Sequence, residues 1–293
     1  MKLSMPTASV LVLTWNHERY ISQAIESILA QTWKDVEVIL LDNCSSDDTL
    51  RIAKKILSES GIKYSIIERS APCGIAENFN YLYTQSTGDY IFPLSGDDWY
   101  HPDMISTKIG YLKLNADVGV LSSGGWIYYD DVDQYEEMDV TNYLRGHIYK
   151  EVLQKAGAFN FVGLCYRRSV LEDVGLWDGN LLIEDLDMFI RISLKYKIDY
   201  LEEPLVFYRK NKNSASANVS YMIKGWEQYY DKYKAVSWVN MRHWLADRYR
   251  IYAALLIDKK QQKEALSLLW KSAKLNPLNI NLVKTWAYYI RSL

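Results

Sequence analysis

Two adjacent carboxylates, Asp97 and Asp98, follow Ser95-Gly96 in the first half of the chain. Neighbouring carboxylates in a tight turn repel each other unless a cation lies between them or solvent screens them. Oxygen ligands suit Mg²⁺ or Mn²⁺, and Mg²⁺ commonly completes its coordination shell with water and substrate phosphates. The pair is therefore a candidate site for a metal-bound diphosphate. A turn with solvated side chains explains the pair equally well when it is considered alone.

A second acidic group opens a predicted helix. Glu184, Asp185 and Asp187 begin a segment with apolar residues at helical spacing that runs to about Tyr196. Acidic side chains are favourable at this end of a helix because the free N–H groups and the helix dipole stabilise negative charge. That effect explains one or two of the three carboxylates but does not require all of them.

The elements that would position these residues alternate between strand and helix. Short β-branched apolar runs predict strands, and apolar residues at helical spacing predict the helices between them. This order indicates a mostly parallel sheet covered by helices, with right-handed crossovers. Ser45 and Asp48 resemble a capping box at the start of the second helix. The predicted strands are Ala8–Thr14, Val36–Leu41, Tyr64–Ile67 and Tyr90–Leu94, and the predicted helices are 21–29, 50–57 and 75–84.

In an open parallel sheet, ligands bind beyond the carboxyl ends of the strands. Polar residues occur at three of these ends: Thr14-Trp15-Asn16, Asp42-Asn43 and the segment 95–98. A dehydrogenase is not indicated, because no GxGxxG follows the first strand to approach a pyrophosphate. The phosphate-binding pattern GxxxxGK[ST] is absent from the sequence as well.

These motifs together resemble a known family. The chain is similar to family 2 inverting glycosyltransferases of the GT-A fold over roughly residues 6–216. Five separated motifs occur in the family's order, which makes the resemblance specific. They are Thr14-Trp15-Asn16, the segment 42–49 (DNCSSDDT), Gly74–Asn78, the segment 88–98 (GDYIFPLSGDD), and Glu184–Asp187 with Tyr208-Arg209.

The resemblance implies roles for individual residues. Asp97, with Asp98, would hold Mn²⁺ or Mg²⁺, and Asp97 would also contact the donor. Asp185 matches the family's general base. Two positions depart from the pattern: Ser95 replaces the first acid of the Asp-x-Asp motif, and Asn211 stands where many relatives have histidine. The residues implied for nucleotide binding are Thr14, Asn16, Asp42, Asp48 and Asn78, and those implied for acceptor or auxiliary roles are Glu184 and Arg209.

The expected chemistry follows from the reaction itself. Moving a sugar from a nucleotide diphosphate requires stabilisation of the leaving diphosphate and removal of a proton from the acceptor hydroxyl. A cation at Asp97 and Asp98 would stabilise the leaving diphosphate. Asp185, on the opposite side of the sugar, would accept the proton from the acceptor hydroxyl. In-line attack then inverts the anomeric carbon, by analogy with inverting glycosidases. Trp99 could line the base or sugar, although core packing is as good an explanation. His17 is more simply a bystander in its loop.

The near-zero net charge hides a division of the chain. Residues 219–293 contain 13 Lys and Arg against 5 Asp and Glu, a balance of +8, whereas residues 1–218 contain 21 against 31, a balance of −10. We expect a catalytic domain over residues 1–218 and a basic, Trp-rich helical extension over residues 219–293. The extension could contact an anionic membrane, where a lipid-linked acceptor would lie. Tryptophans packed in its core are the alternative.

The predicted function is therefore a metal-dependent inverting glycosyltransferase. It would take a nucleotide-diphospho-sugar donor and a glycan or lipid-linked acceptor in polysaccharide biosynthesis. The acidity of residues 1–218 argues against nucleic-acid binding. No apolar run of about 18 residues is present, so we expect a cytoplasmic protein, with peripheral contact at the inner membrane face as a further option. A non-catalytic glycan- or protein-binding module is the alternative function, motivated by Ser95 and Asn211. A nucleotidyltransferase is a weaker alternative function.

Overall fold

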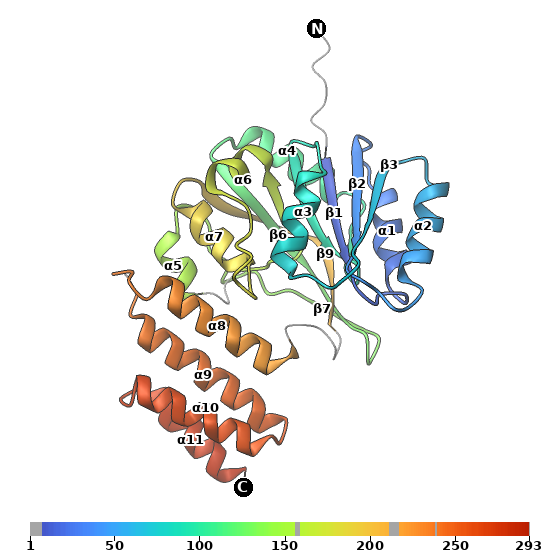
Figure 1. Ribbon diagram of the computed structural model, residues 1–293. Coiled ribbons are helices and arrows are strands. Elements are labelled where there is room, and N and C mark those ends of the chain that lie inside the picture. The colour runs from blue at the N-terminus through green and yellow to red at the C-terminus, as the bar shows by residue number, and fades with distance from the viewer. Residues whose placement is uncertain (1–7, 156–158, 211–216, 238, 293) are drawn as a thin grey trace. The chain divides into compact units, whose positions relative to one another are not determined.

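The computed structural model describes residues 8–155, 159–210, 217–237 and 239–292 (Figure 1). These residues form two compact units. One comprises residues up to Gly179 together with Glu184–Asn211, and the other comprises Asn180–Ile183 together with Lys212–Leu293. The first unit carries the sheet and the predicted donor site, and the second is helical. Asn211 itself lies outside the described residues.

The sheet of the first unit has nine strands in the order β3-β2-β1-β4-β8-β6-β9-β5, with β7 paired to β6. Pairing is parallel from β3 to β4, as the alternating pattern predicts, whereas β8 joins β4 and β6 antiparallel. The fold is thus the predicted α/β arrangement of a mostly parallel sheet covered by helices. The strands are β1 (Ala8–Thr14), β2 (Val36–Asp42), β3 (Lys63–Glu68), β4 (Tyr90–Ser95), β5 (Trp99–Tyr100), β6 (Val118–Tyr129), β7 (Gln134–Glu137), β8 (Cys165–Arg167) and β9 (Lys197–Lys210).

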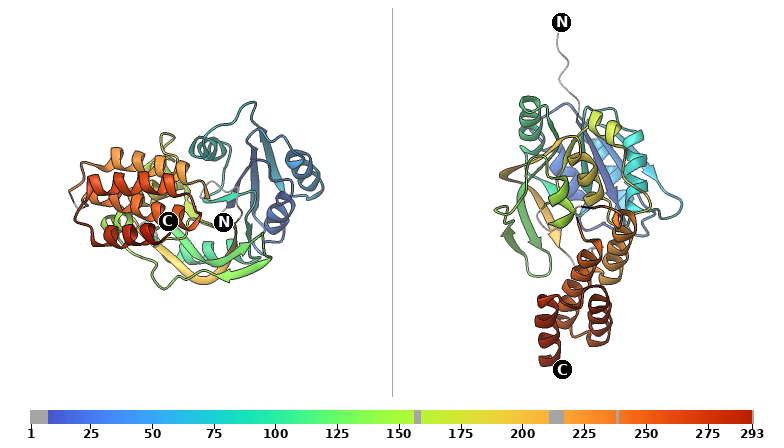
Figure 2. Two further views of the ribbon diagram at one scale, coloured as in Figure 1. Left: turned by 90° about the horizontal axis from the view of Figure 1, so that it is seen from below. Right: turned by 90° about the vertical axis from the view of Figure 1, so that its left-hand side faces the viewer.

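Helices cover both faces of this sheet (Figures 1 and 2). Successive side chains of a strand point to opposite faces. Val10 and Val12 of β1 join one core cluster with side chains of α1, α2 and α4. On the other face α3 contacts β1 and β2. The helices of this unit are α1 (Ile21–Leu29), α2 (Thr49–Glu59), α3 (Ile75–Thr84), α4 (Met104–Leu114), α5 (Tyr149–Gln154), α6 (Arg168–Val174) and α7 (Asp185–Ser193).

The predicted capping box before α2 is wrong. Asp48 stands at the N-cap position without a side-chain capping bond, and α2 begins at Thr49. Ser45 instead donates its hydroxyl to Asp42 at 2.6 Å. The loop therefore uses Ser45 to shape the end of β2, and a local pattern could not reveal this because the partner lies before the helix.

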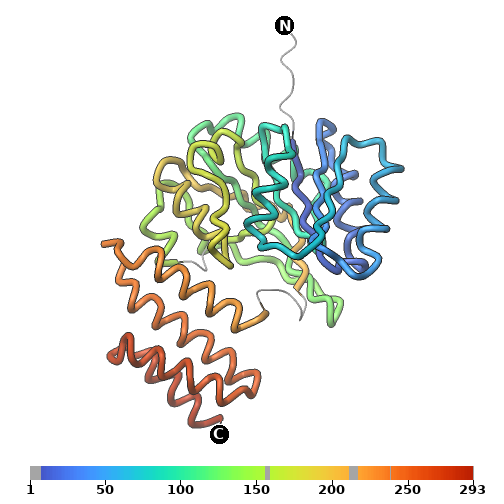
Figure 3. The backbone as a smooth tube through the Cα atoms, viewed as in Figure 1, coloured from blue at the N-terminus to red at the C-terminus, as the bar shows by residue number. Residues whose placement is uncertain are grey.

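The helical unit consists of α8 (Val219–Tyr233), α9 (Met241–Asp258), α10 (Gln262–Leu275) and α11 (Ile280–Arg291), which Figure 3 follows in orange and red. Asn218, Asn240 and Asn279 cap three of these helices with their side chains. Buried aromatic rings pack between α8 and α9, with Trp226 and Trp244 5.6 Å apart. Tryptophan thus contributes to a core of this unit. None of the helices in the described part of the chain has the length and hydropathy needed to cross a membrane.

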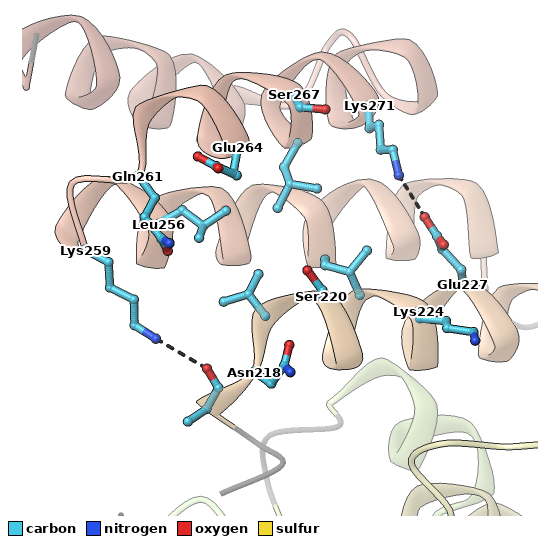
Figure 4. Close-up of a pocket in the computed structure, with 14 residues that line it drawn as sticks. Asn218, Ser220, Lys224, Glu227, Leu256, Lys259, Gln261, Glu264, Ser267 and Lys271 are labelled. Atoms are coloured by element: carbon cyan, nitrogen blue, oxygen red, sulfur yellow. Dashed lines mark hydrogen bonds and ion pairs between the residues drawn. The ribbon is translucent and has the colours of Figure 1, made fainter. Parts of the chain in front are cut away.

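A cavity of about 930 Å³ lies among α8, α9 and α10 (Figure 4). Its wall contains charged, polar and apolar side chains. Lys271 forms an ion pair with Glu227 at 3.0 Å, and Lys259 donates to the carbonyl of Ala217 at 3.4 Å. This cavity belongs to the helical unit and contains none of the residues predicted to bind the donor.

Candidate functional site

The ends of three neighbouring strands meet at one edge of the sheet. Thr14 of β1 lies opposite Asp42 of β2, and Leu13 lies opposite both Leu41 and Ser95. The loops after β1, β2 and β4 therefore leave the sheet side by side. Parallel pairing in this register brings together segments as far apart in sequence as Leu13 and Ser95, as the strand-end argument predicts.

Asp42 links the first two of these loops. Its carboxylate is buried and accepts hydrogen bonds from the Ser45 amide at 2.9 Å and the Ser45 hydroxyl at 2.6 Å. The Ser45 hydroxyl oxygen in turn accepts the amide of Asn16 at 2.9 Å. Each carboxylate oxygen has a second lone pair. Asp42 can thus shape the loop and still accept a hydrogen bond from a ligand.

Asn16 adopts a left-handed backbone conformation with φ of 54°. Asparagine tolerates this region better than most residues do. Its side-chain oxygen accepts the amide of Ser46 at 2.8 Å, and the amide of His17 donates to Thr49 Oγ1 at 2.7 Å. The residue type at position 16 therefore serves loop geometry in addition to any contact with a donor.

The other two predicted nucleotide-binding residues differ from each other in exposure. Asn78 is buried in α3, where its amide donates to the Cys73 carbonyl at 3.2 Å and accepts from Arg69 at 3.0 Å. Asp48 is exposed and forms a two-point contact with Arg51. The structure gives Asn78 a role in shaping the loop before α3, and it gives Asp48 a surface ion pair.

Gly96 allows the loop after β4 to approach β1 closely. A Cβ atom at this position would lie 2.7 Å from Thr14 Oγ1 and 2.9 Å from His17 Nδ1. Both distances are well below van der Waals contact. Ser95, which replaces the family's first acid, donates its hydroxyl to Asp97 at 2.5 Å. Ser95 thus orients Asp97 without adding a charge.

Two polar atoms beside Gly96 are buried, and no protein partner is found for them among the described residues: Thr14 Oγ1 and His17 Nδ1. Burial lowers the pKa of His17, although the carboxylates of Asp97, Asp47 and Asp42 oppose that effect. Buried polar atoms without partners are costly, so they mark a place where a ligand or water completes the hydrogen bonding. The buried Nδ1 of His17 therefore favours a role in ligand binding over the interpretation of His17 as a bystander. Its position three residues after the strand end was the signal available in the sequence.

Asp98 has a hydrogen-bond partner in β9. Its carboxylate is buried and accepts the backbone amide of Arg209 in β9 at 2.8 Å. Burial, together with the neighbouring Asp97, raises the pKa of Asp98 well above its ordinary value. Asp98 thus links the turn to β9, and its role as the second cation ligand stays a prediction.

Arg209 joins several loops from a buried position. Its guanidinium donates to the Asp97 carbonyl at 3.0 Å and pairs with Asp130 at 2.7 Å. The group also lies over the rings of Tyr20, Trp99 and Tyr128, at 4.5 to 4.9 Å from their centroids. Arg209 therefore holds the Asp97 turn in place. Asp130 directly follows β6.

Trp99 is buried and stacks on Phe207 with ring centroids 5.0 Å apart and planes 3° apart. It thus packs in an aromatic cluster between β5 and β9. Trp15, by contrast, is 55% exposed in the loop after β1. Of these two tryptophans, Trp15 is the one with a face available to a ligand.

Glu184 and Asp185 lie at the beginning of α7. Burial raises the pKa of Asp185 to about 7. Burial, followed by the charge of Asp185, also raises the pKa of Glu184. Close to this pair the hydroxyl of Tyr166 is buried, with no partner among the described residues, and both carboxylates contribute to its raised pKa. No sequence pattern indicated Tyr166, because this residue lies in the short strand β8.

Asp187 has a structural explanation. It is fully buried and pairs with Arg191 at 2.7 Å, one turn later in α7. Arg191 also donates to the carbonyls of Val174, Gly175 and Leu176. The ion pair therefore ties α7 to the end of α6, and the acidic group of the sequence divides into this pair and the Glu184–Asp185 pair.

Comparison with known proteins identifies the family. The model of glycosyl transferase family 2 matches residues 9–175. The chain belongs to this family. It is 33% identical over 125 residues to EpsE of Bacillus subtilis, provisionally described as a glycosyltransferase, and 28% identical over 214 residues to the uncharacterized glycosyltransferase alr2836 of Nostoc sp.. These matches cover 43% and 69% of the chain. They span 45% and 64% of the relatives, less than two thirds of either length.

Solved structures share the fold of this family member. A fragment of S. aureus TarS in complex with UDP-GlcNAc has a TM-score of 0.66 at 16% identity, covering 98% of this chain and 89% of that one. The mannosyltransferase PcManGT from Pyrobaculum calidifontis, in complex with GDP-Man and Mn²⁺, has a TM-score of 0.58 at 15% identity, covering 99% and 86%. At this level of identity the likeness establishes the GT-A fold.

Proposed function

We propose that this family 2 glycosyltransferase moves a sugar from a nucleotide-diphospho-sugar to a hydroxyl of a glycan or lipid-linked acceptor, with inversion. The observation that supports the proposal is a group of polar side chains at the ends of β1, β2 and β4. We call this group, Thr14, His17, Asp42 and Asp97, the polar cradle. There Gly96 brings the Asp97 turn against Thr14 and His17, and within the described residues no partner is found for the buried atoms Thr14 Oγ1 and His17 Nδ1. A donor needs such a preformed set of polar groups at a strand-end edge.

The donor's nucleotide would lie against the loops after β1 and β2. Asp42 is positioned there by Ser45 and can accept a hydrogen bond from the nucleoside. The exposed ring of Trp15 offers a surface for stacking. The complexes of TarS with UDP-GlcNAc and of PcManGT with GDP-Man support a nucleoside diphosphate as the donor's common part.

A divalent cation fits this cradle only together with a diphosphate. Within the described residues there is no group of three or more His, Cys, Asp or Glu side chains that could hold a metal ion. Asp97 provides one carboxylate, and Mg²⁺ or Mn²⁺ sites of this type take further oxygens from phosphates and water. When bound, the cation would neutralise charge on the leaving diphosphate. We therefore assign Asp97, and not Asp98, to hold it.

Asp185 would act as the general base. A carboxylate is an effective base near neutral pH when its pKa is raised toward that pH, and burial raises the pKa of Asp185 to about 7. In the reaction the acceptor oxygen bonds to the anomeric carbon as the bond to the diphosphate oxygen breaks, and the acceptor's proton passes to the Asp185 carboxylate. Attack opposite the leaving group inverts the configuration. This step requires Asp185 to face the same cleft as Asp97.

The acceptor would belong to a surface polysaccharide or another glycan, carried on a lipid or free, and the protein would work in the cytoplasm at the inner face of a membrane. The basic composition of residues 219–293 supports attraction to anionic lipids.

A thermal-shift panel tests donor binding. Purified protein is heated with UDP, GDP, UDP-GlcNAc and GDP-Man, each with and without Mn²⁺, because a ligand selective for the folded state raises the unfolding temperature. We expect one nucleoside diphosphate and its sugar to stabilise the protein, with a larger effect when Mn²⁺ is present. No shift with any nucleotide would contradict the proposal. A shift without turnover on any hydroxyl acceptor would favour a binding module.

A further inference from the structure

The last helix of the chain presents an apolar face to solvent. Ile280, Val283, Ala287 and Ile290 follow one another at the spacing i, i+3, i+7 and i+10 along α11, and we call them the α11 stripe. Ile280, Val283 and Ile290 are 72%, 63% and 65% exposed. The opposite face of α11 is already used, since Leu282, Thr285 and Tyr289 are buried. The α11 stripe is thus additional to the face that forms the core of the helical unit.

Further apolar groups lie close to the stripe. Leu278, in the turn before α11, is 93% exposed. Trp270 of α10 is 56% exposed, and its ring lies 5.4 Å from that of Trp286. A surface helix ordinarily presents polar residues opposite its core face, and contiguous exposed apolar patches mark interaction sites. The surface formed by the α11 stripe with Leu278 and Trp270 therefore requires a partner.

Basic residues predominate in the sequence of α10 and α11. From residue 265 to the end of the chain there are four Lys or Arg residues and no Asp or Glu. Lys284 and Arg291 are exposed on α11, and Lys274 is exposed near the end of α10. One carboxylate also reaches α11, since Asp258 of α9 accepts a hydrogen bond from the Tyr288 hydroxyl. An apolar stripe with basic residues beside it suits an anionic partner.

We propose that this surface of α10 and α11 docks on an anionic lipid bilayer. The α11 stripe and Leu278 enter the boundary between headgroups and acyl chains, Trp270 lies at the interface, and Lys284 and Arg291 contact lipid phosphates. A second copy of the chain fits less well, because an isologous contact would bring the same basic residues of both copies together. The inference does not depend on the transfer reaction, since it rests only on the helical unit.

Vesicle sedimentation of the full chain tests this surface. One set of vesicles contains phosphatidylcholine alone, and the other contains phosphatidylcholine with about one third phosphatidylglycerol. We expect binding to the anionic vesicles only. The triple variant Ile280→Ser, Val283→Ser, Ile290→Ser should lose at least about tenfold in binding, because the apolar residues supply the insertion energy. A control pair, Leu114→Ser and Val132→Ser, removes exposed apolar side chains from the first unit and should bind like the wild type.

A charge-reversed variant keeps the test decisive if the triple variant is poorly folded. Lys284→Glu with Arg291→Glu should weaken binding to anionic vesicles. The control Lys55→Glu with Arg242→Glu changes the net charge equally at other exposed positions and should have a much smaller effect.

Two results would overturn the proposal: wild-type protein that does not bind anionic vesicles, or stripe variants that bind them as the wild type does. A dimer in sedimentation velocity that the triple variant abolishes, without vesicle binding, would assign the surface to a second copy. The nucleotide-induced thermal shift should be the same in all variants, which separates this outcome from failure of the proposed function.

Discussion

Individual side chains divide into those that build the loops and those left to act on a ligand. Asp98, Asp187 and Arg209 look reactive in the sequence, yet each is buried and held by a specific partner. His17 and Asp185 have the opposite character. In the part of the chain that the structure describes, no partner is found for the buried Nδ1 of His17, and burial raises the pKa of Asp185 to about 7. We therefore expect His17 and Asp185, and not Asp98, Asp187 or Arg209, to act on a ligand.

The first prediction concerns Asp185→Asn. The amide cannot accept the proton from the acceptor hydroxyl, so transfer should fall by at least about a hundredfold, the usual contribution of a general base. Donor binding should remain nearly intact, because the substitution preserves size and the donor contacts lie in other loops. Initial transfer rates and the nucleotide-induced thermal shift measure the two effects. Equal loss of both would show that Asp185 is structural.

The second prediction concerns pH. A base with a raised pKa is protonated, and therefore inactive, below that pKa. Transfer measured as kcat/KM should fall as the pH drops through about 7 and level off above it, because burial raises the pKa of Asp185 to about 7. The observed midpoint belongs to the coupled pair of Glu184 and Asp185. A flat profile from about pH 6 to 8, with donor binding also unchanged, would contradict the assignment.

Among the structural elements, the turn after β4 depends most closely on one residue type. Gly96 lies against Thr14 and His17 with no room for a side chain, and Asp98 and Arg209 fasten the turn to β9. The close approach of the β1 and β4 loops is what produces the cradle.

Gly96→Ala tests this contact as the third prediction. The added methyl group would lie within 3 Å of Thr14 Oγ1 and His17 Nδ1, so the turn must move away from β1. We expect a loss of roughly 1 to 3 kcal/mol in the free energy of unfolding, as for other overpacked sites, and a clear weakening of donor binding. Chemical denaturation and nucleotide titration measure the two quantities. Gly110→Ala is the control, because a methyl group there meets no atom within 4 Å. Normal donor binding by Gly96→Ala would remove the cradle from the proposal.

At the scale of the whole molecule, the helical unit includes residues 180–183, which directly precede Glu184 and Asp185. The Tyr229 hydroxyl donates to the Ile183 carbonyl at 2.7 Å, Tyr221 donates to the Leu182 carbonyl at 2.7 Å, and the Leu182 amide donates to Gln228 at 2.9 Å. Glu184 and Asp185 follow directly in the chain. Side chains of α8 thus hold the backbone of residues 182–183, directly before the proposed general base.

The fourth prediction is that Tyr229→Phe lowers kcat without changing donor affinity. The Ile183 carbonyl loses its hydrogen-bond partner, at a cost of about 1 kcal/mol in stability, and the backbone before Asp185 becomes less constrained. Because small misplacements of a reacting group are costly, we expect roughly a tenfold loss in kcat. Tyr249→Phe is a matched control, since its hydroxyl donates to Glu227 at 2.7 Å within the same unit. Equal effects of both variants on kcat would show that only general stability matters.

Much of this protein is determined by the sequence alone. The apolar runs and helical spacings place β1 and α3 at their observed bounds, and the order of motifs identifies the family. Local periodicity is sufficient for this because it depends on residues within one element. The helical extension is likewise visible in its charge and tryptophan content.

Only the tertiary structure decided which polar residues are available to a ligand. Asp97 and Asp98 are adjacent and chemically identical, yet Asp98 faces β9, more than a hundred residues away in sequence, while Asp97 stays beside His17. The burial of Asp187 and the exposure of the α11 stripe are likewise set by tertiary structure, since burial depends on which other elements pack against a side chain. Partners distant in the chain leave no local pattern, so the choice between a structural carboxylate and a reactive one belongs to the folded molecule.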